Sequence, residues 1–212
     1  MDAYSLLTEP PGIGERFFGV VIGVVTNNKD PDGLGRVKMS LPWMADQVES
    51  DWARVVTPMA GPGRGIYFLP EVNDEVLVAF EHGNPDMPFV LGGLWNGKDK
   101  PPASNSDGKN DLRTIRTRSG NQIKFSDADG DASIEIIDSS GNNTIVIRAK
   151  DNSITITSAG DIAISADKGN LKLSGKSVQI TATTTVKAEA SQAMELKSSG
   201  QLTVKGSVVN IN

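Results

Sequence analysis

The chain has 212 residues, with 21 basic and 26 acidic side chains and a net charge of −5. It therefore lacks the excess of positive charge that binding to a nucleic-acid backbone needs. It contains no cysteine and one histidine, which excludes disulfides, thiolate chemistry and a multi-histidine metal site within one chain. No apolar run reaches the roughly 18 residues of a membrane-spanning helix, and residues 1–11 lack the regions of a signal peptide. We therefore expect synthesis in the cytoplasm, with any release by another route.

The composition changes sharply near residue 100. All 11 prolines lie between Pro10 and Pro102, and Phe125 is the one aromatic residue after Trp95. Residues 1–110 hold 9 basic and 15 acidic side chains, a net charge of −6, whereas residues 111–212 have a net charge of +1. These shifts predict an N-terminal extension at 1–17, a first domain at 18–96, a linker rich in turn-forming residues at 97–110 and a repetitive second domain at 111–212.

Five short strands are predicted in the first domain, because apolar and polar residues alternate between clusters of Gly, Pro, Asn and Asp. Their expected bounds are 18–25, 36–41, 52–57, 75–80 and 89–94. Helical periodicity is missing from this part of the sequence. Five antiparallel strands in about 80 residues favour a Greek-key barrel of the OB-fold type, and a small sandwich is the alternative.

The second domain is a repeat in which apolar residues recur in pairs, two positions apart. The pairs are Ile123/Phe125, Ile134/Ile136, Ile145/Ile147, Ile154/Ile156, Ile162/Ile164, Leu171/Leu173, Val178/Ile180, Val186/Ala188, Met194/Leu196, Leu202/Val204 and Val209/Ile211. From Ile145 onward the period is close to eight residues, with Gly, Asn, Asp or Ser mostly between the pairs. A spacing of two places both members on one face of a strand, so each unit predicts one short strand and one turn.

Such a strand has a narrow apolar face and open edges, and it cannot be stable alone. A single-chain β-solenoid is one solution, but eleven pairs give fewer than four coils and no recognisable caps. Three intertwined chains are the other solution, with the apolar pairs meeting on a shared axis. We therefore predict a homotrimeric, triple-stranded β-helix. Its core is expected to contain Ile145, Ile147, Ile154, Ile156, Ile162, Ile164, Leu171, Leu173, Val178, Ile180, Leu202 and Val204.

Several motifs of the first domain carry a family resemblance. They are Asp30–Lys38 followed by Leu41-Pro42-Trp43, and then the stretches 54–61, 65–85 and 88–96. Their sequences resemble the signature of the phage baseplate assembly protein V family and of the related VgrG spikes of type VI secretion. The resemblance covers roughly residues 18–102, and the repeated second domain is similar to the triple-stranded β-helix needle of the same family.

The resemblance implies a structural central spike of a contractile phage tail or contractile injection system. Such a spike pierces a target envelope, has no enzymatic activity and needs no cofactor or metal. Because about 17 residues precede the barrel, we expect the trimeric hub at the OB-fold end to be a separate protein. The octad pattern continues to Val209 and Ile211, which are expected to bind a PAAR-like tip protein. Assembly in the cytoplasm and delivery to the target envelope on contraction are implied as well.

Few residues suggest other chemistry. Asp127–Asp131 lacks the spacing of an EF-hand calcium loop, and Gly61–Gly65 lacks the Lys-Ser/Thr end of a phosphate loop. His82 follows a predicted strand, where a structural role in a turn is expected rather than general-base catalysis. The cluster Arg113, Arg116 and Arg118 is expected to form ion pairs between chains.

Two other functions remain as alternatives. A single-chain β-solenoid enzyme acting on polysaccharide would need clustered carboxylates, and the acidic residues after Asp138 are scattered along the sequence. An OB-fold binding adaptor would leave the repeat unexplained. Nucleic-acid binding through aromatic platforms is disfavoured by the net charge of −6 in residues 1–110.

Overall fold

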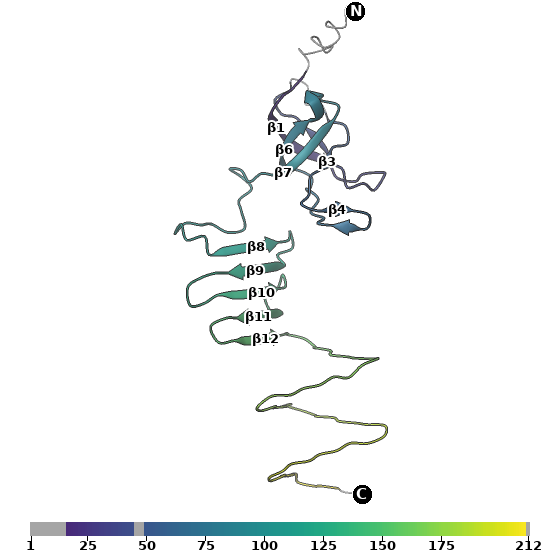
Figure 1. The fold of residues 1–212 in the computed structure, drawn as a ribbon, viewed down its shortest axis with the longest axis vertical. Coiled ribbons are helices and arrows are strands. Elements are labelled where there is room, and N and C mark those ends of the chain that lie inside the picture. Colours follow the sequence, from purple (N-terminus) through teal and green to yellow (C-terminus); the bar gives the residue numbers. More distant parts are fainter. Residues whose placement is uncertain (1–15, 45–48, 211–212) are drawn as a thin grey trace, which may run out of the picture. The chain divides into compact units, whose positions relative to one another are not determined.

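The computed structural model describes residues 16–44 and 49–210 (Figure 1). Within these ranges the chain is all-β, with strands, one short 3-10 helix and no α-helix. The described residues include no helix with the length and apolar character needed to cross a membrane. The chain divides into a unit that ends at Ala159 and a unit that begins at Gly160.

The first domain is a curled five-stranded sheet in the order β2-β1-β6-β7-β3. Its strands are β1 (Val20–Asn27), β2 (Lys38–Ser40), β3 (Arg54–Val55), β6 (Glu75–Phe80) and β7 (Pro88–Gly93). β3 runs parallel to β7, and the other neighbours are antiparallel. Backbone hydrogen bonds of 3.0 and 2.8 Å between Val37 and Ala53 join the two edges of the sheet. The five predicted strands are therefore confirmed, with β6 at its predicted bounds and the ends of the other four shifted by one or two residues.

The core of this domain is formed by the side chains that point inward from the curled sheet. In β6 the side chains alternate between half-buried and buried, and Val76 and Val78 are fully buried. Gly23 on β1 faces the same core, because a Cβ atom there would lie 2.9 Å from the sulfur of Met39. The other buried apolar residues are Val25, Val37, Leu41, Ala53, Phe80 and Val90.

The carboxylate of Asp30 organises the turn between β1 and β2. It accepts hydrogen bonds from the backbone N–H of Leu34 at 3.0 Å and from Nε of Arg36 at 2.9 Å. The Arg36 guanidinium holds the pKa of Asp30 well below its usual range. Gly33 and Gly35 have φ angles of 67° and 71°, in the left-handed region that favours glycine. The motif that begins at Asp30 thus encodes one tightly hydrogen-bonded turn.

A short hairpin of β4 (Ala60–Gly61) and β5 (Arg64–Gly65) was not among the predicted strands. Gly63, between the two strands, has a φ angle of 65°, which suits its place in the turn. After β5 the chain returns to the barrel and enters β6. The 3-10 helix follows β6 at Glu81–Gly83, so the expected turn at His82 is found there.

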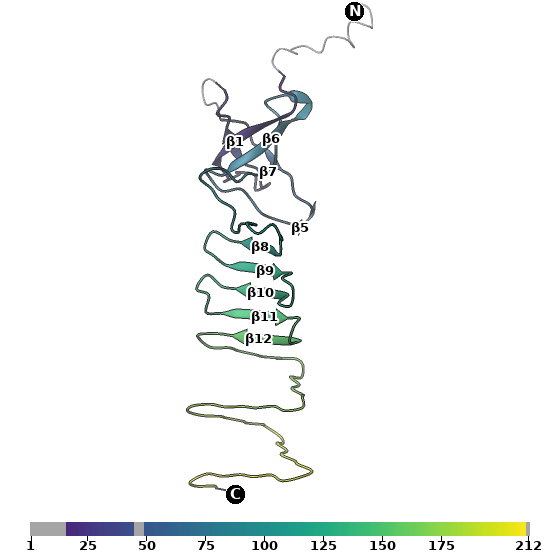
Figure 2. The same ribbon diagram turned by 90° about the vertical axis from the view of Figure 1, so that its left-hand side faces the viewer.

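A second five-stranded sheet covers residues 112–157. It contains β8 (Leu112–Arg116), β9 (Gln122–Ser126), β10 (Ser133–Ile137), β11 (Thr144–Arg148) and β12 (Ser153–Thr157). Figure 2 shows these strands stacked in chain order, and each pairs antiparallel with the next. Their backbone ladders are formed within one chain.

This meander corrects the expectation that every repeat from residue 111 onward contributes a strand to a winding shared by three chains. The first apolar pairs begin at Ile123, Ile134 and Ile145, which are 11 residues apart. That spacing provides one five-residue strand plus a connection long enough to reverse the chain. β11 and β12 lie in the part of the sequence with the shorter period and still pair within the chain, across a connection of residues 149–152. The intertwined winding is therefore confined to a prediction for the repeats after Thr157.

The second unit differs from this sheet. Within its described residues, 160–210, no strand is paired with another part of the same chain. Its apolar side chains are exposed, with Ile164 at 69%. The triple-stranded β-helix remains a prediction for this unit, and so do the domain boundaries drawn from composition.

Candidate self-assembly surface

One face of the β8–β12 sheet carries two rows of apolar side chains. Cross-strand partners lie on the same face of a sheet, so the registers define each row. The first row is Ile115, Ile123, Ile136, Ile145 and Ile156, and the second is Phe125, Ile134, Ile147 and Ile154. The first row runs across all five strands and the second across β9 to β12, because Arg113 occupies the β8 position opposite Phe125. The apolar surface is therefore continuous from β8 to β12 along the first row.

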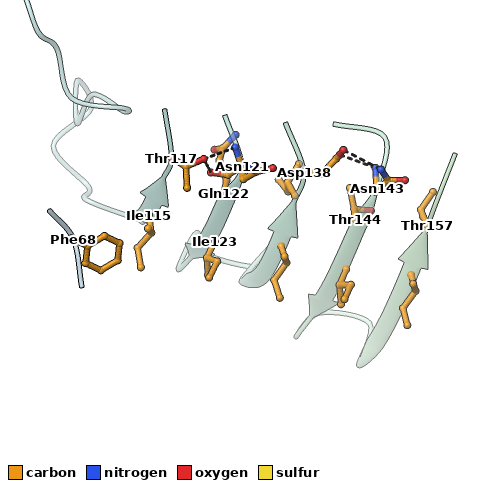
Figure 3. A pocket seen from close by; sticks show the side chains of 14 residues that line it. Phe68, Ile115, Thr117, Asn121, Gln122, Ile123, Asp138, Asn143, Thr144 and Thr157 are labelled. Atoms are coloured by element: carbon orange, nitrogen blue, oxygen red, sulfur yellow. Dashed lines mark hydrogen bonds between the residues drawn. The ribbon is translucent and has the colours of Figure 1, made fainter. Parts of the chain in front are cut away.

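Both rows are open to solvent in a single chain. Their members from β8 to β11 are 40–49% exposed, whereas Val76 and Val78 in the barrel are fully buried. The first row lines an open groove of about 690 Å³, and Figure 3 shows Ile115 and Ile123 side by side in it. A continuous exposed apolar surface of this kind is typical of an interaction site. We therefore take this surface, defined by the two rows, as the candidate self-assembly face.

The opposite face of the sheet is mostly polar. Its central row is Thr114, Lys124, Glu135, Val146 and Thr155. Lys124 forms an ion pair with Glu135 at 3.4 Å, and the Ser133 hydroxyl donates to Glu135 at 2.9 Å. The chemistry of the two faces therefore predicts which one is buried by assembly.

The structure brings four of the predicted core residues together: Ile145 and Ile147 on β11, and Ile154 and Ile156 on β12. The others lie in the second unit, where they are exposed: Ile162, Ile164, Leu171, Leu173, Val178, Ile180, Leu202 and Val204. Of the two residues predicted at the tip-binding end, Val209 is exposed and Ile211 lies outside the described residues. The assignment of these positions to a trimer core and a tip site stays a prediction.

Two residues of the groove were missed by sequence reasoning. Ile115 has no apolar partner two positions away, since Arg113 and Thr117 occupy those places. Phe68 belongs to the barrel domain and follows Tyr67 without any repeat that links it to the later sheet. The paired residues Ile123/Phe125 and Ile134/Ile136 gave a clear signal, but they were not included in the predicted core.

Two of the three arginines in the cluster form ion pairs within the chain, and pairing between chains stays a prediction. Arg113 contacts the carboxylate of Asp127 at 2.5 Å, and Arg118 contacts Glu71 at 2.8 Å. All four side chains are largely exposed, so each pair contributes about 0–1 kcal/mol. These arginines therefore help to position loops.

The turn between β10 and β11 depends on Asp138. Its carboxylate accepts hydrogen bonds from the Ser140 hydroxyl at 2.8 Å and from the backbone N–H and side-chain amide of Asn143, each at 3.0 Å. These bonds, led by the one from Ser140, lower the pKa of Asp138 to about 2. This perturbed carboxylate thus has a structural explanation, and the described part of the chain holds no group of three or more His, Cys, Asp or Glu that could bind a metal.

Comparison with known proteins identifies the class to which the barrel belongs. Residues 21–95 match the family described as the type VI secretion system/phage-baseplate injector OB domain. The first domain is therefore similar to an injector OB domain, and the predicted OB-fold is confirmed.

The chain is also similar to VgrG proteins. It is 31% identical over 133 residues to the type VI secretion system spike protein VgrG3 of Vibrio cholerae, covering 58% of this chain and 13% of that protein. It is 37% identical over 87 residues to the spike protein VgrG5 of Pseudomonas aeruginosa, covering 39% of this chain and 11% of that protein. A further relative, 30% identical over 129 residues, is the actin cross-linking toxin VgrG1 of Vibrio cholerae. The match covers 57% of this chain and 12% of that protein.

The chain is thus VgrG-like, and the resemblance predicted from its motifs is confirmed. It spans 13% or less of the length of these three relatives.

Proposed function

We propose that this chain is the central spike of a contractile phage tail or contractile injection system. In this proposal three copies associate, the OB domains form a collar, and residues 111–212 form the needle. The apolar face of β8–β12 supports the proposal most directly, because two rows of half-exposed side chains need a cover. The second unit supports it independently, since its described residues have no paired strand within the chain.

The spike acts mechanically in this proposal. Contraction of a sheath drives it into a target envelope, where a narrow needle concentrates force on a small area. Strands stack at about 4.7 Å, and a rod whose backbone groups are paired, within the chain in β8–β12 and between chains in the later repeats, resists buckling. No bond is made or broken by the chain, and delivery to the envelope follows assembly in the cytoplasm.

Light scattering in solution tests the trimer. We expect a mass three times the 22.5 kDa of one chain at micromolar concentration. A folded species with the mass of one chain would instead favour the single-chain solenoid or the OB-fold adaptor. The measurement therefore separates the spike from both alternatives.

Two partners complete the proposal. The outward side chains of β1 include Val20 and Ile22, which are 56% and 47% exposed and offer an apolar surface for a trimeric hub at the OB end. Val208 and Val209 are exposed as well, and they offer an apolar surface for a PAAR-like tip protein. Loop Gly61–Gly65 is a further candidate contact with the hub.

Deletion of Gly206–Asn212 is expected to abolish binding of the tip protein and to leave the trimer intact, because the preceding repeats still hold the chains together. Pull-down with proteins encoded beside this chain measures the binding, and light scattering checks the trimer. Unchanged tip binding after the deletion, or binding of the tip to a fragment with the barrel alone, would reverse the proposed polarity.

A further inference from the structure

The segment between β5 and β6 is held against the barrel at both ends. Near its start, the Thr57 hydroxyl donates a hydrogen bond of 2.7 Å to the carbonyl of Ile66. Near its end, the side-chain amide of Asn28 donates one of 3.0 Å to the carbonyl of Pro70. Leu69 packs against the buried core of the barrel. The backbone of this segment is therefore fixed in place.

Phe68 projects from the fixed segment into a different environment. Its neighbour Leu69 turns into the barrel core, whereas Phe68 remains 66% exposed. Phe68 lines the same groove as Ile115 and Ile123, and Figure 3 shows its ring beside Ile115. The barrel thus places one large apolar side chain at the first strand of the self-assembly face.

A polar contact joins the same two elements. Arg118, in the turn between β8 and β9, donates a hydrogen bond of 2.8 Å to the carboxylate of Glu71. Glu71 is itself held by a hydrogen bond of 2.8 Å from its backbone N–H to the carboxylate of Asp74. The segment that carries Phe68 is therefore joined to the first hairpin of the sheet by a charged pair, and Phe68 lines the groove together with Ile115.

We infer that Phe68 is a plug that closes the barrel-side end of the apolar interior of the trimer. This inference rests on the proposed function, because Phe68 of one chain is covered by side chains of the two other copies in the trimer. Those side chains are their Phe68 and Ile115. β8 has one paired neighbour, β9, in the described sheet, so the apolar face would otherwise end at Ile115 in contact with water. Three rings at this level shield that end from solvent.

The plug also affects how force is transmitted. The linker at 97–110 is mostly exposed and polar, and a chain of that kind extends under load. Packing of Phe68 on Ile115 gives a second connection between barrel and sheet. Force applied to the barrel then reaches the needle through packed side chains as well as through the linker.

Single cysteine variants test the plug without interference from other thiols, because the natural chain contains no cysteine. In Phe68→Cys, the proposal places three thiols close together at the axis. A small-molecule disulfide added as oxidant then links two of the three chains through a disulfide bond and leaves the third chain unlinked. The matched control is Tyr67→Cys: Tyr67 is 76% exposed, and its ring lies against Gly35 of the barrel. We expect a disulfide-linked dimer on a non-reducing gel for Phe68→Cys and single chains for the control.

The outcomes distinguish the plug from the spike. A mass of three chains without cross-linking at position 68, or with equal cross-linking at 67 and 68, overturns the plug and leaves the trimer standing. A mass of one chain for the unmodified protein overturns the trimer and the plug together.

A second pair of variants avoids dependence on disulfide geometry. Phe68→Asp is expected to accelerate amide exchange over Leu112–Arg116 by about tenfold in the trimer, because an opened end exposes β8 to local unfolding. Tyr67→Asp is expected to leave that exchange unchanged. Equal exchange rates in both variants and the unmodified protein would overturn the plug.

Discussion

Ile164→Asp is expected to lower the melting temperature of the protein strongly, and Ala163→Asp is expected to be nearly silent. In a trimer, the first substitution brings three carboxylates together in an apolar interior, and each unpaired buried charge costs on the order of several kcal/mol. In a single chain Ile164 is 69% exposed, so a penalty of this size arises through assembly. Thermal unfolding followed by circular dichroism at equal chain concentrations measures both effects.

Ala163 is a matched control because it lies one position away, on the opposite face of an extended chain. A melting temperature of Ile164→Asp equal to that of the unmodified protein would mean that the two faces are inverted. Equal losses in both variants would mean that the segment does not present one face to an axis.

The barrel could be predicted because inward and outward side chains alternate along its strands, and the burial of every second side chain is visible in the sequence pattern. In β6, Val76, Val78 and Phe80 face the core, and every second residue lies on the outer face. The β4–β5 hairpin could not be predicted in the same way. Its strands have two residues each, and Ala60, Gly61, Arg64 and Gly65 contain no large apolar side chain whose burial would mark a face.

The intrachain pairing of β8–β12 could not be predicted from the apolar pairs alone. Ile134/Ile136 and Ile162/Ile164 look alike, because a spacing of two places both members on one face whether a strand pairs within or between chains. The connections carry the difference. Between β10 and β11, the chain contains Asp138 and Asn143, whose hydrogen bonds build a reversing turn.

The candidate surface was only partly predictable for a related reason. Ile145 and Ile154 belong to an evident repeat, so their common face follows from the sequence. Phe68 reaches the same groove from 47 positions before Ile115, and no local pattern reports a contact between residues so far apart. This proximity depends on how the segment at Glu71 packs against the β8–β9 turn at Arg118, which is a matter of tertiary structure.

The two halves of the chain are expected to respond differently to dilution. The OB domain has its own buried core and intrachain ladders, so the denaturant midpoint of residues 21–95 should be independent of chain concentration. The needle should instead unfold at lower denaturant when the protein is diluted, because dissociation of a trimer gives three chains. Each tenfold dilution favours separated chains by about 2.8 kcal/mol per trimer, two concentration factors of about 1.4 kcal/mol each.

Amide exchange in guanidinium at two chain concentrations measures this difference segment by segment. Residues 160–210 should show the largest dependence on concentration, since no strand pairing within one chain protects their described backbone. Residues 112–157 should depend on it less, because their ladders from β8 to β12 are intrachain and persist in part after dissociation. Midpoints for 160–210 that do not move with chain concentration would contradict pairing between chains, because a backbone stabilised by partner strands must lose protection when those partners are diluted away.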